Sequence, residues 1–177
     1  MIVNGKSLLA AQPILSMVPC KVNGPGGTSY GLGEAGYDIR VAQTLILFPG
    51  RRFRLASTME QFDMPLNLLG EVADKSTWAR RKLTVQNTKI EPGWRGTLTL
   101  ELIYHGYRFL RVPAGSGIAQ IVFHELIENG DYGDGKYQDQ EARPVKARNS
   151  GVQCKTGMKA RSRTARQVRI AAPPRSI

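Results

Sequence analysis

The sequence predicts an all-β fold, a barrel or a jelly roll with few and short helices. Residues 45–69 contain apolar stretches of only a few residues each, separated by turn signals such as Pro49-Gly50. Residues 97–104 alternate apolar and polar side chains, which is the pattern of a half-buried strand. Short strands punctuated by proline and glycine are typical of barrels and sandwiches, whereas βαβ folds alternate strands with longer helices.

A chain of 177 residues is long enough for one domain with a hydrophobic core and too short for two ordinary domains. Its content of 41% hydrophobic and 22% charged residues is that of a water-soluble globular protein. No apolar run approaches the roughly 20 residues of a membrane helix, and the N-terminus lacks the features of a signal peptide. We therefore expect a cytoplasmic protein without a membrane partner.

The net charge of +11 is concentrated toward the C-terminus. Residues 1–140 carry 15 lysines and arginines against 13 acidic residues, whereas residues 141–177 carry 10 against Glu141 alone. Because the last segment also lacks apolar periodicity, we expect a domain over residues 1–145 and a basic, disordered tail over residues 146–177. Basic tails are usually solvated, so we do not expect nucleic acid as a partner except through this tail.

The N-terminal part is predicted to contain a short helix, a loop and the first strand. Residues 6–17 show a helical apolar pattern that Pro13 breaks, which suits a packing helix. Residues 24–36 contain six glycines and Pro25, a composition typical of a loop. Residues 36–40 then begin the sheet.

Residues 74–81 are predicted to form one turn of helix. Asp74 or Ser76 can cap its N-terminus, and no glycine or proline interrupts it. The lysine, serine and threonine that follow Asp74 lie where free backbone amides, the helix dipole and a cation suit a phosphate. Ser76 and Arg80 are four residues apart and therefore share a face. A solvated surface helix is the alternative interpretation of this basic run.

The turn at Pro92-Gly93 is predicted to lead into the strand at residues 97–104. In this strand the leucines and Tyr104 occupy one face, and Glu101, the only charge, lies on the other. If that second face is also covered, the pKa of Glu101 rises, which suits a group that takes and returns protons near neutral pH. The alternation equally allows a Glu101 that faces solvent.

The chain lacks the residues of zinc-dependent nucleobase deaminases. Its cysteines are Cys20 and Cys154, and its histidines are His105 and His124. None belongs to the H-x-E or P-C-x-x-C signatures that supply the zinc ligands of those enzymes. A base deaminase built from this sequence is therefore expected to work without zinc and without other metal ligands from the protein.

Several segments resemble the motifs of the dCTP deaminase branch of the dUTPase-like superfamily. They occur in family order, which makes them more specific together than any one alone. The segments are GYDIR at 36–40, DKSTWARR at 74–81, VQNTKIEPGWRG at 85–96, LTLEL at 98–102, GSGIAQIVF at 115–123 and KYQDQ at 136–140. The resemblance implies a distorted jelly roll that assembles as a homotrimer with its sites between subunits, and it implies a structural role for Asp38.

The resemblance also implies the residues of the site. It implies a catalytic centre made of Glu101, Ser76 and Arg80, with the carboxylate as general base. It implies that the nucleotide is bound by Lys75, Thr77, Gln86, Asn87, Thr88, Glu91, Trp94, Tyr132, Lys136 and Gln140. The chain departs from the family at Asn87-Thr88, where an Ala-His pair is usual, and at Glu91, where the family has aspartate. In dUTPases that aspartate also orients the attacking water, so the longer Glu91 weakens a dUTPase interpretation.

The expected reaction is metal-independent hydrolytic deamination of dCTP to dUTP and ammonia, supplying dUTP and dUMP for thymidylate synthesis. Mg²⁺ is expected only as an ion carried by the triphosphate. Three alternatives remain open. One is a dUTP diphosphatase or a bifunctional dCTP deaminase and dUTPase, and another is a deaminase of dCMP or of a modified deoxycytidine nucleotide. The third is a non-catalytic protein that binds nucleotides or, through the basic tail, nucleic acid.

Overall fold

The computed structural model describes residues 1–50 and 53–149. The tail predicted over residues 146–177, with Cys154, therefore lies outside the described residues from residue 150 onward. Within the described ranges, no helix combines the length and the apolar character needed to cross a membrane.

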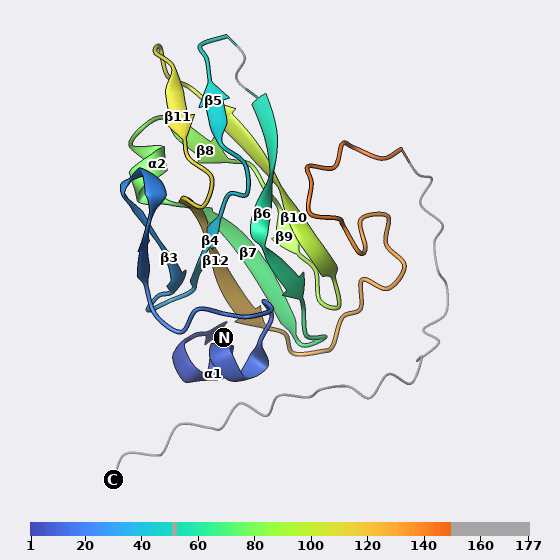
Figure 1. Cartoon of the computed structure of the whole chain (residues 1–177). Helices are drawn as coiled ribbons and strands as arrows, with labels where there is room; N and C mark the ends of the chain where they lie inside the picture. Colours follow the sequence, from blue (N-terminus) through green and yellow to red (C-terminus); the bar gives the residue numbers. More distant parts are fainter. Residues whose placement is uncertain (51–52, 150–177) are drawn as a thin grey trace.

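The predicted all-β architecture is confirmed, and the fold is a distorted jelly roll of antiparallel strands (Figure 1). The helical elements are α1 (Gly5–Ala11), the 3-10 turn η1 (Pro25–Gly27) and α2 (Ser76–Ala79). The strands are β1 (Ile2–Val3), β2 (Val22–Gly24), β3 (Thr28–Leu32), β4 (Tyr37–Arg40), β5 (Leu45–Leu47), β6 (Phe53–Asp63), β7 (Leu68–Asp74), β8 (Leu83–Val85), β9 (Lys89–Ile90), β10 (Arg95–Tyr104), β11 (Leu110–Val112) and β12 (Gly117–Glu125).

The described strands form three sheets. The largest has the order β2-β3-β4-β12-β7-β9, with β1 paired to the end of β12. A second sheet places β10 between β6 and β8, and a third pairs β11 with β5. A bridge from Val41 to Thr58 joins the end of β4 to β6. Strand β10 is therefore held on both edges, by β6 over most of its length and by β8 at its C-terminal end.

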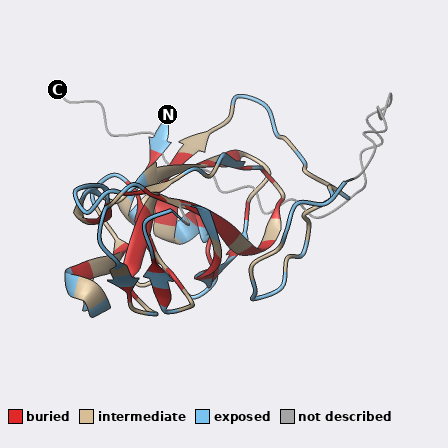
Figure 2. Cartoon of the chain, turned by 90° about the horizontal axis from the view of Figure 1, so that it is seen from above, coloured by how far each residue is buried: buried red, intermediate tan, exposed pale blue. Residues whose placement is uncertain are grey.

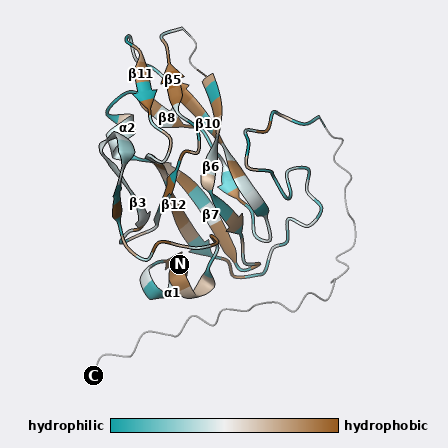
Figure 3. Cartoon of the chain, viewed as in Figure 1, coloured by the Kyte–Doolittle hydropathy of each residue, from teal (hydrophilic) through white to brown (hydrophobic). Residues whose placement is uncertain are grey.

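The hydrophobic core lies between the sheets. Its largest fully buried side chains include Trp78, Tyr37, Phe62, Phe123, Leu100 and Leu102. Seen from above, buried residues line the strands around this core, while the segment after β12 is largely intermediate or exposed (Figure 2). The same segment is mostly hydrophilic, in contrast to β5 and β12 (Figure 3). The segment therefore lies outside the core and against the barrel.

The N-terminal prediction is confirmed for the helix and wrong for part of the loop. Helix α1 ends at Ala11, and Gln12 takes a left-handed conformation directly before Pro13. The glycine-rich stretch, predicted to be a loop, contains strand β3. Gly31 in β3 has a φ of +100°, and a Cβ there would come within 2.3 Å of the Cys20 carbonyl oxygen. Glycine is needed here because the strand passes close to another backbone segment.

A buried ion pair fixes β4 to β6. Arg40 Nε donates to Glu60 Oε1 at 2.7 Å, and the Arg40 N–H donates to Oε2 at 2.8 Å. Glu60 is only 4% exposed, and this burial raises the pKa of its carboxyl group even though Arg40 opposes the rise. Removing one partner would leave a buried charge unpaired, so the contact holds the two strands in one arrangement.

Trp78 joins α2 to β12, and this contact predicts a loss of stability on substitution. Its side chain is 1% exposed, and its Nε1 donates to the Gly117 carbonyl at 2.7 Å. We predict that Trp78→Phe lowers the free energy of unfolding by about 1–3 kcal/mol, because a buried carbonyl loses its donor. Urea unfolding at a fixed protein concentration, followed by the fluorescence of the remaining Trp94, measures the change.

Tyr107→Phe is the matched control for this experiment. It also removes one polar atom from an aromatic side chain, but Tyr107 is 84% exposed. A loss in Trp78→Phe no larger than the loss in Tyr107→Phe would contradict the importance of the contact with Gly117.

Candidate active site

Helix α2 (Ser76–Ala79) lies within the predicted range of residues 74–81, but neither Asp74 nor Ser76 caps it. The N-cap position is Lys75, and no side chain makes a capping hydrogen bond there. The Asp74 carboxylate instead accepts a hydrogen bond of 2.7 Å from the Val85 N–H in β8. This backbone donor needs a partner where β8 ends, and the carboxylate supplies it. The predicted cap is therefore wrong, and Asp74 joins the entrance of α2 to β8.

Lys75 is engaged with the buried Asp38. Its Nζ lies 2.5 Å from Asp38 Oδ2, and the Lys21 Nζ lies 3.3 Å from the same oxygen. Gln120 Nε2 donates to Asp38 Oδ1 at 3.4 Å. Asp38 is 1% exposed, so these donors offset the cost of burying its charge. Asp38 thus serves as scaffold, and it shares the Lys75 ammonium that the sequence assigned to phosphate.

The three side chains predicted to be catalytic have no partner within residues 1–50 and 53–149. Ser76, Arg80 and Glu101 are exposed, and none of these side chains forms a hydrogen bond or ion pair with another described residue. The Arg80 N–H bonds the Ser76 carbonyl at 3.0 Å, so the two residues lie one turn apart on α2. Thr77, beside Ser76, is half-buried. These groups are available to a ligand.

Strand β10 carries Glu101 with the predicted alternation. Leu100 and Leu102 are fully buried, and the carboxylate between them is exposed. Leu102 is paired with Val85 of β8, the residue that Asp74 holds. The Asp74–Val85 hydrogen bond and the Val85–Leu102 pairing therefore connect the start of α2 to the residue next to Glu101. The single chain leaves the face of β10 that carries the Glu101 carboxylate uncovered at this position.

Asn87 extends the β8–β10 ladder with its side chain. Its Oδ1 accepts the Glu101 N–H at 3.0 Å, and its Nδ2 donates to the Thr99 carbonyl at 2.7 Å. The Gln86 N–H also bonds the Glu101 carbonyl, at 2.8 Å. The Asn87 amide, which the sequence assigned to the nucleotide, is thus committed to the strand that carries Glu101. Thr88, which follows, is exposed.

Gln140 is attached to the same face of β10 as Glu101. Its Oε1 accepts a hydrogen bond of 2.8 Å from the Thr99 hydroxyl, which accepts the Val145 N–H at 3.0 Å. Gly96 permits this approach, because its φ is +132° and a Cβ there would come within 2.5 Å of Gln140 N. Residues 99 and 101 share one face of a strand. The C-terminal segment therefore covers this face as far as Thr99 and leaves Glu101 open.

The other predicted binding residues hold the C-terminal segment in place. The buried Trp94 donates from Nε1 to the Tyr137 carbonyl at 2.7 Å, and the Tyr132 hydroxyl accepts the Tyr137 N–H at 3.2 Å. Lys136 Nζ donates to the Arg148 carbonyl at 3.2 Å. Among the described residues, no hydrogen bond or ion pair links this group to α2. Glu91 lies exposed at the turn before β10.

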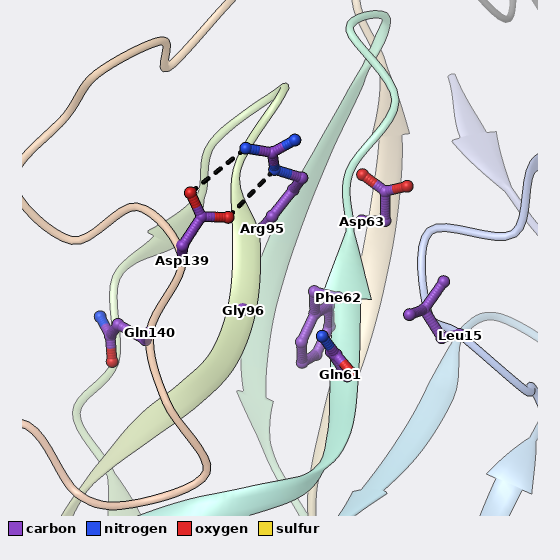
Figure 4. Close-up of a pocket in the computed structure, with 8 residues that line it drawn as sticks. All are labelled: Leu15, Gln61, Phe62, Asp63, Arg95, Gly96, Asp139 and Gln140. Atoms are coloured by element: carbon purple, nitrogen blue, oxygen red, sulfur yellow. Dashed lines mark hydrogen bonds and ion pairs between the residues drawn. The ribbon is translucent and has the colours of Figure 1, made fainter.

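A hollow of about 350 Å³ opens at the start of β10 (Figure 4). Arg95 lies along it and is held by Asp139, with Nε 3.2 Å from Oδ1 and Nη2 3.2 Å from Oδ2. Gln140 is the only predicted site residue in its lining. Because the Arg95 charge is already neutralised and Glu101 lies further along the strand, we do not assign this hollow to the predicted substrate.

Residues 1–50 and 53–149 contain no group of three or more His, Cys, Asp or Glu side chains arranged to hold a metal ion. His105 Nε2 lies 3.3 Å from the Thr84 hydroxyl, and His124 Nε2 lies 3.2 Å from a Glu71 carboxylate oxygen. Both histidines therefore have protein partners.

Two contacts that position the site had no signal in the sequence. Asp74 and Val85 are 11 residues apart, and Lys75 and Asp38 are 37 residues apart. Local patterns report neighbours within a helix turn or a strand pair, so they do not reach such distances. Asp74 and Asp38 both belong to motifs noted in the sequence, but their hydrogen-bond partners are known only from the folded structure.

The Asn87 contacts predict local protection of strand β10 at Glu101. We predict that Asn87→Ala speeds amide hydrogen exchange at Glu101 by roughly threefold to tenfold, because the amide loses its acceptor. Exchange measured residue by residue tests this. Gln86→Ala is the control, since its side chain makes only a marginal 3.5 Å contact with Thr84. Equal protection of Glu101 in the two variants would contradict the role of Asn87.

Comparison with known proteins identifies the family. Residues 32–126 match the model of the dCTP deaminase-like family. A dCTP deaminase of Campylobacter jejuni is 35% identical, with the match covering 68% of this chain and 83% of that protein. A dCTP deaminase of Herpetosiphon aurantiacus is also 35% identical, with coverage of 65% and 80%.

A solved structure supports the fold. The 2′-deoxycytidine 5′-triphosphate deaminase from Agrobacterium tumefaciens superposes with a TM-score of 0.54 at 19% identity, covering 69% of this chain and 47% of that chain. The residues matched by the family model include α2, β10 and β12, and therefore Ser76, Arg80 and Glu101. The chain belongs to the dCTP deaminase-like family.

Proposed function

We propose that the protein catalyses the hydrolytic deamination of dCTP to dUTP and ammonia. One observation carries this proposal: within the family match, Ser76, Arg80 and Glu101 are exposed and free of partners in the described chain. Their neighbours Asp74 and Asn87 are committed to the scaffold, so the free groups are those left for chemistry. The product supplies dUTP and dUMP for thymidylate synthesis, and a free nucleotide substrate implies a cytoplasmic enzyme.

Glu101 acts as the general base. Water is a weak nucleophile near neutral pH, so a carboxylate must take a proton as the water oxygen attacks C4 of cytosine. One water proton passes to N3 and the other to the amino group, after which the C4–N bond breaks and ammonia leaves. A single carboxylate accepts and returns these protons.

Ser76 and Arg80 act on either side of this proton transfer. The Ser76 hydroxyl positions the water by a hydrogen bond. The Arg80 guanidinium orients the Glu101 carboxylate and stabilises the charge that develops at C4 and N3. Both side chains reach the reaction from α2, which is anchored through Trp78 and Lys75 and not through the catalytic groups.

The nucleotide is bound by backbone and side chains together. Backbone groups of residues 86–88 read the base edge, because the Asn87 amide is held by β10. Thr77 and Lys136 bind phosphate oxygens, and Lys75 contributes the ammonium hydrogens that Asp38 does not use. Mg²⁺ enters with the triphosphate, whose oxygens it prefers. Tyr132 and Gln140 belong to the segment that closes over the nucleotide.

A homotrimer with sites between subunits completes the centre. In the single chain the C-terminal segment stops at Thr99, so Glu101 faces solvent and Lys136 has no described link to α2. A neighbouring chain that lies against β10 covers Glu101 and brings its own α2 to the carboxylate. This cover also excludes bulk water from the carboxylate.

The central prediction concerns Glu101. We predict that Glu101→Gln lowers the rate of ammonia release from dCTP by about 100-fold to 10,000-fold, because the amide cannot accept a proton. Binding of dCTP and Mg²⁺, measured by calorimetry, should stay nearly unchanged. Glu128→Gln is the control, since Glu128 is an exposed acid beyond β12 and should leave both properties as they are.

Deamination retained in Glu101→Gln would remove Glu101 from the mechanism. The same assay with dCTP, dCMP and dUTP in parallel identifies the substrate. Pyrophosphate released from dUTP in place of ammonia from dCTP would contradict the proposal and favour a diphosphatase.

The subunit arrangement is tested by mixing two inactive variants. In a trimer whose sites combine Ser76 of one chain with Glu101 of the next, mixed trimers of Ser76→Ala and Glu101→Gln chains retain one intact site each. Random co-assembly should therefore restore roughly a quarter of the wild-type activity. Each variant assembled with itself is the control, and no recovery after co-expression would place both residues of a site on one chain.

A further inference from the structure

Three segments of the domain contain basic residues and no acidic ones, and parts of all three meet at one end of the fold. Residues 41–59, 75–90 and 102–124 contain ten of the chain's 25 lysines and arginines and no aspartate or glutamate. Strands β5 and β11 and the adjoining end of β6 lie together at one end of the molecule, opposite α1 (Figure 1). Arg51 and Arg52 lie outside the described residues, and Lys75 and Lys89 are paired with Asp38 and Glu71. The exposed cations on the strands and loops near this end are Arg54, Lys82, Arg108 and Arg111.

Four aromatic rings are exposed at the same end. Tyr107 is 84% exposed, Phe109 70%, Phe53 57% and Phe48 52%. Exposed single apolar residues are ordinary, but four large rings on adjoining loops and strand ends are not. They place flat apolar faces directly against solvent.

Strand pairing holds these rings close to cations. In the antiparallel pairing of β11 with β5, Leu110 lies opposite Leu47. This register places the preceding Phe109 beside Phe48. In the pairing of β10 with β6, Ile103 lies opposite Phe53. Ile103 is near the end of β10, and the loop that follows this strand contains Tyr107. Figure 1 shows these strand ends together.

The cations among the rings are not neutralised. Lys82 Nζ lies 4.4 Å from the centre of the Tyr107 ring. Arg54, Arg108 and Arg111 are exposed, and in the described part of the chain none of them forms an ion pair with an acid. We call this surface the basic end, and it consists of Phe48, Phe53, Arg54, Lys82, Tyr107, Arg108, Phe109 and Arg111.

We propose that the basic end binds single-stranded nucleic acid. Arginines and lysines follow a phosphate backbone, and exposed rings stack on unpaired bases, which a duplex would keep inside. The rings alternate with arginines along the chain, as in Phe53-Arg54 and Tyr107-Arg108-Phe109, so each stacking face has a phosphate partner beside it. This activity is separate from the proposed deamination, because none of the residues of the basic end belongs to that site.

The test uses the full-length protein and an oligothymidylate of about 20 nucleotides carrying a fluorophore. This probe has no cytosine and so cannot be a substrate. Fluorescence anisotropy gives the Kd at about 50 mM and about 200 mM salt, and binding should weaken steeply between them. All variants keep the same C-terminal residues, so differences between them report the basic end alone.

Arg108→Glu and Phe109→Ala should each weaken binding by about fivefold or more. Their matched controls are Lys6→Glu and Ile127→Ala, which change an exposed cation and an exposed apolar side chain away from the basic end and should alter the Kd by less than about twofold. Urea midpoints and light scattering verify that each variant keeps its fold and its oligomeric mass.

Four results would overturn the proposal. The first is absence of binding by the wild type at low salt, and the second is equal binding by the basic-end variants and their controls. The third is a change of oligomeric mass in Arg108→Glu or Phe109→Ala, which would make this end an interface between copies of the chain. Binding to phosphatidylserine vesicles without binding to the oligothymidylate would equally overturn it, in favour of a membrane surface.

Discussion

The buried carboxylate of Asp38 is the constraint on which the position of α2 depends. A charge that is 1% exposed needs its counterions, and Lys75 at the entrance of α2 supplies one of them. Trp78 adds a second tether, because its buried N–H reaches the Gly117 carbonyl in β12. The helical turn is thus attached to the large sheet at two points, and neither uses Ser76 or Arg80. The side chains that anchor this short element are therefore different from those that it leaves free.

Strand β10 is likewise held in place by groups other than its exposed carboxylate. Its backbone is held on both edges, by β6 and β8, and the Asn87 amide takes the place of a peptide group beside Glu101. Its inner face packs Leu100 and Leu102 into the core. A carboxylate on such a strand has a rigid base and a free tip, which suits a proton carrier whose partners arrive with the substrate or with another subunit.

The distribution of charge over the domain depends on strand pairing. In the sequence, most of the net positive charge lies in the C-terminal residues, since basic and acidic residues are nearly equal in number over residues 1–140. Strand pairing brings the ends of β5 and β11 and of β6 and β10 together, and Arg54, Arg108 and Arg111 lie exposed on these strands and their loops. An anionic ligand would be attracted to these exposed cations, and more strongly at low salt.

The sequence by itself determined the all-β class, the family and the alternation of residues 97–104 that sets Glu101 opposite buried leucines. The class, the family and the alternation follow from local periodicity and short motifs, which are present in a segment of sequence whatever it packs against in the fold. Only the tertiary structure decided that Asp74 bonds Val85 and does not cap α2, and that the Asn87 amide serves β10. Each polar group had several local options, and the choice among them depends on which unpaired donors and acceptors folding brings beside it from elsewhere in the chain.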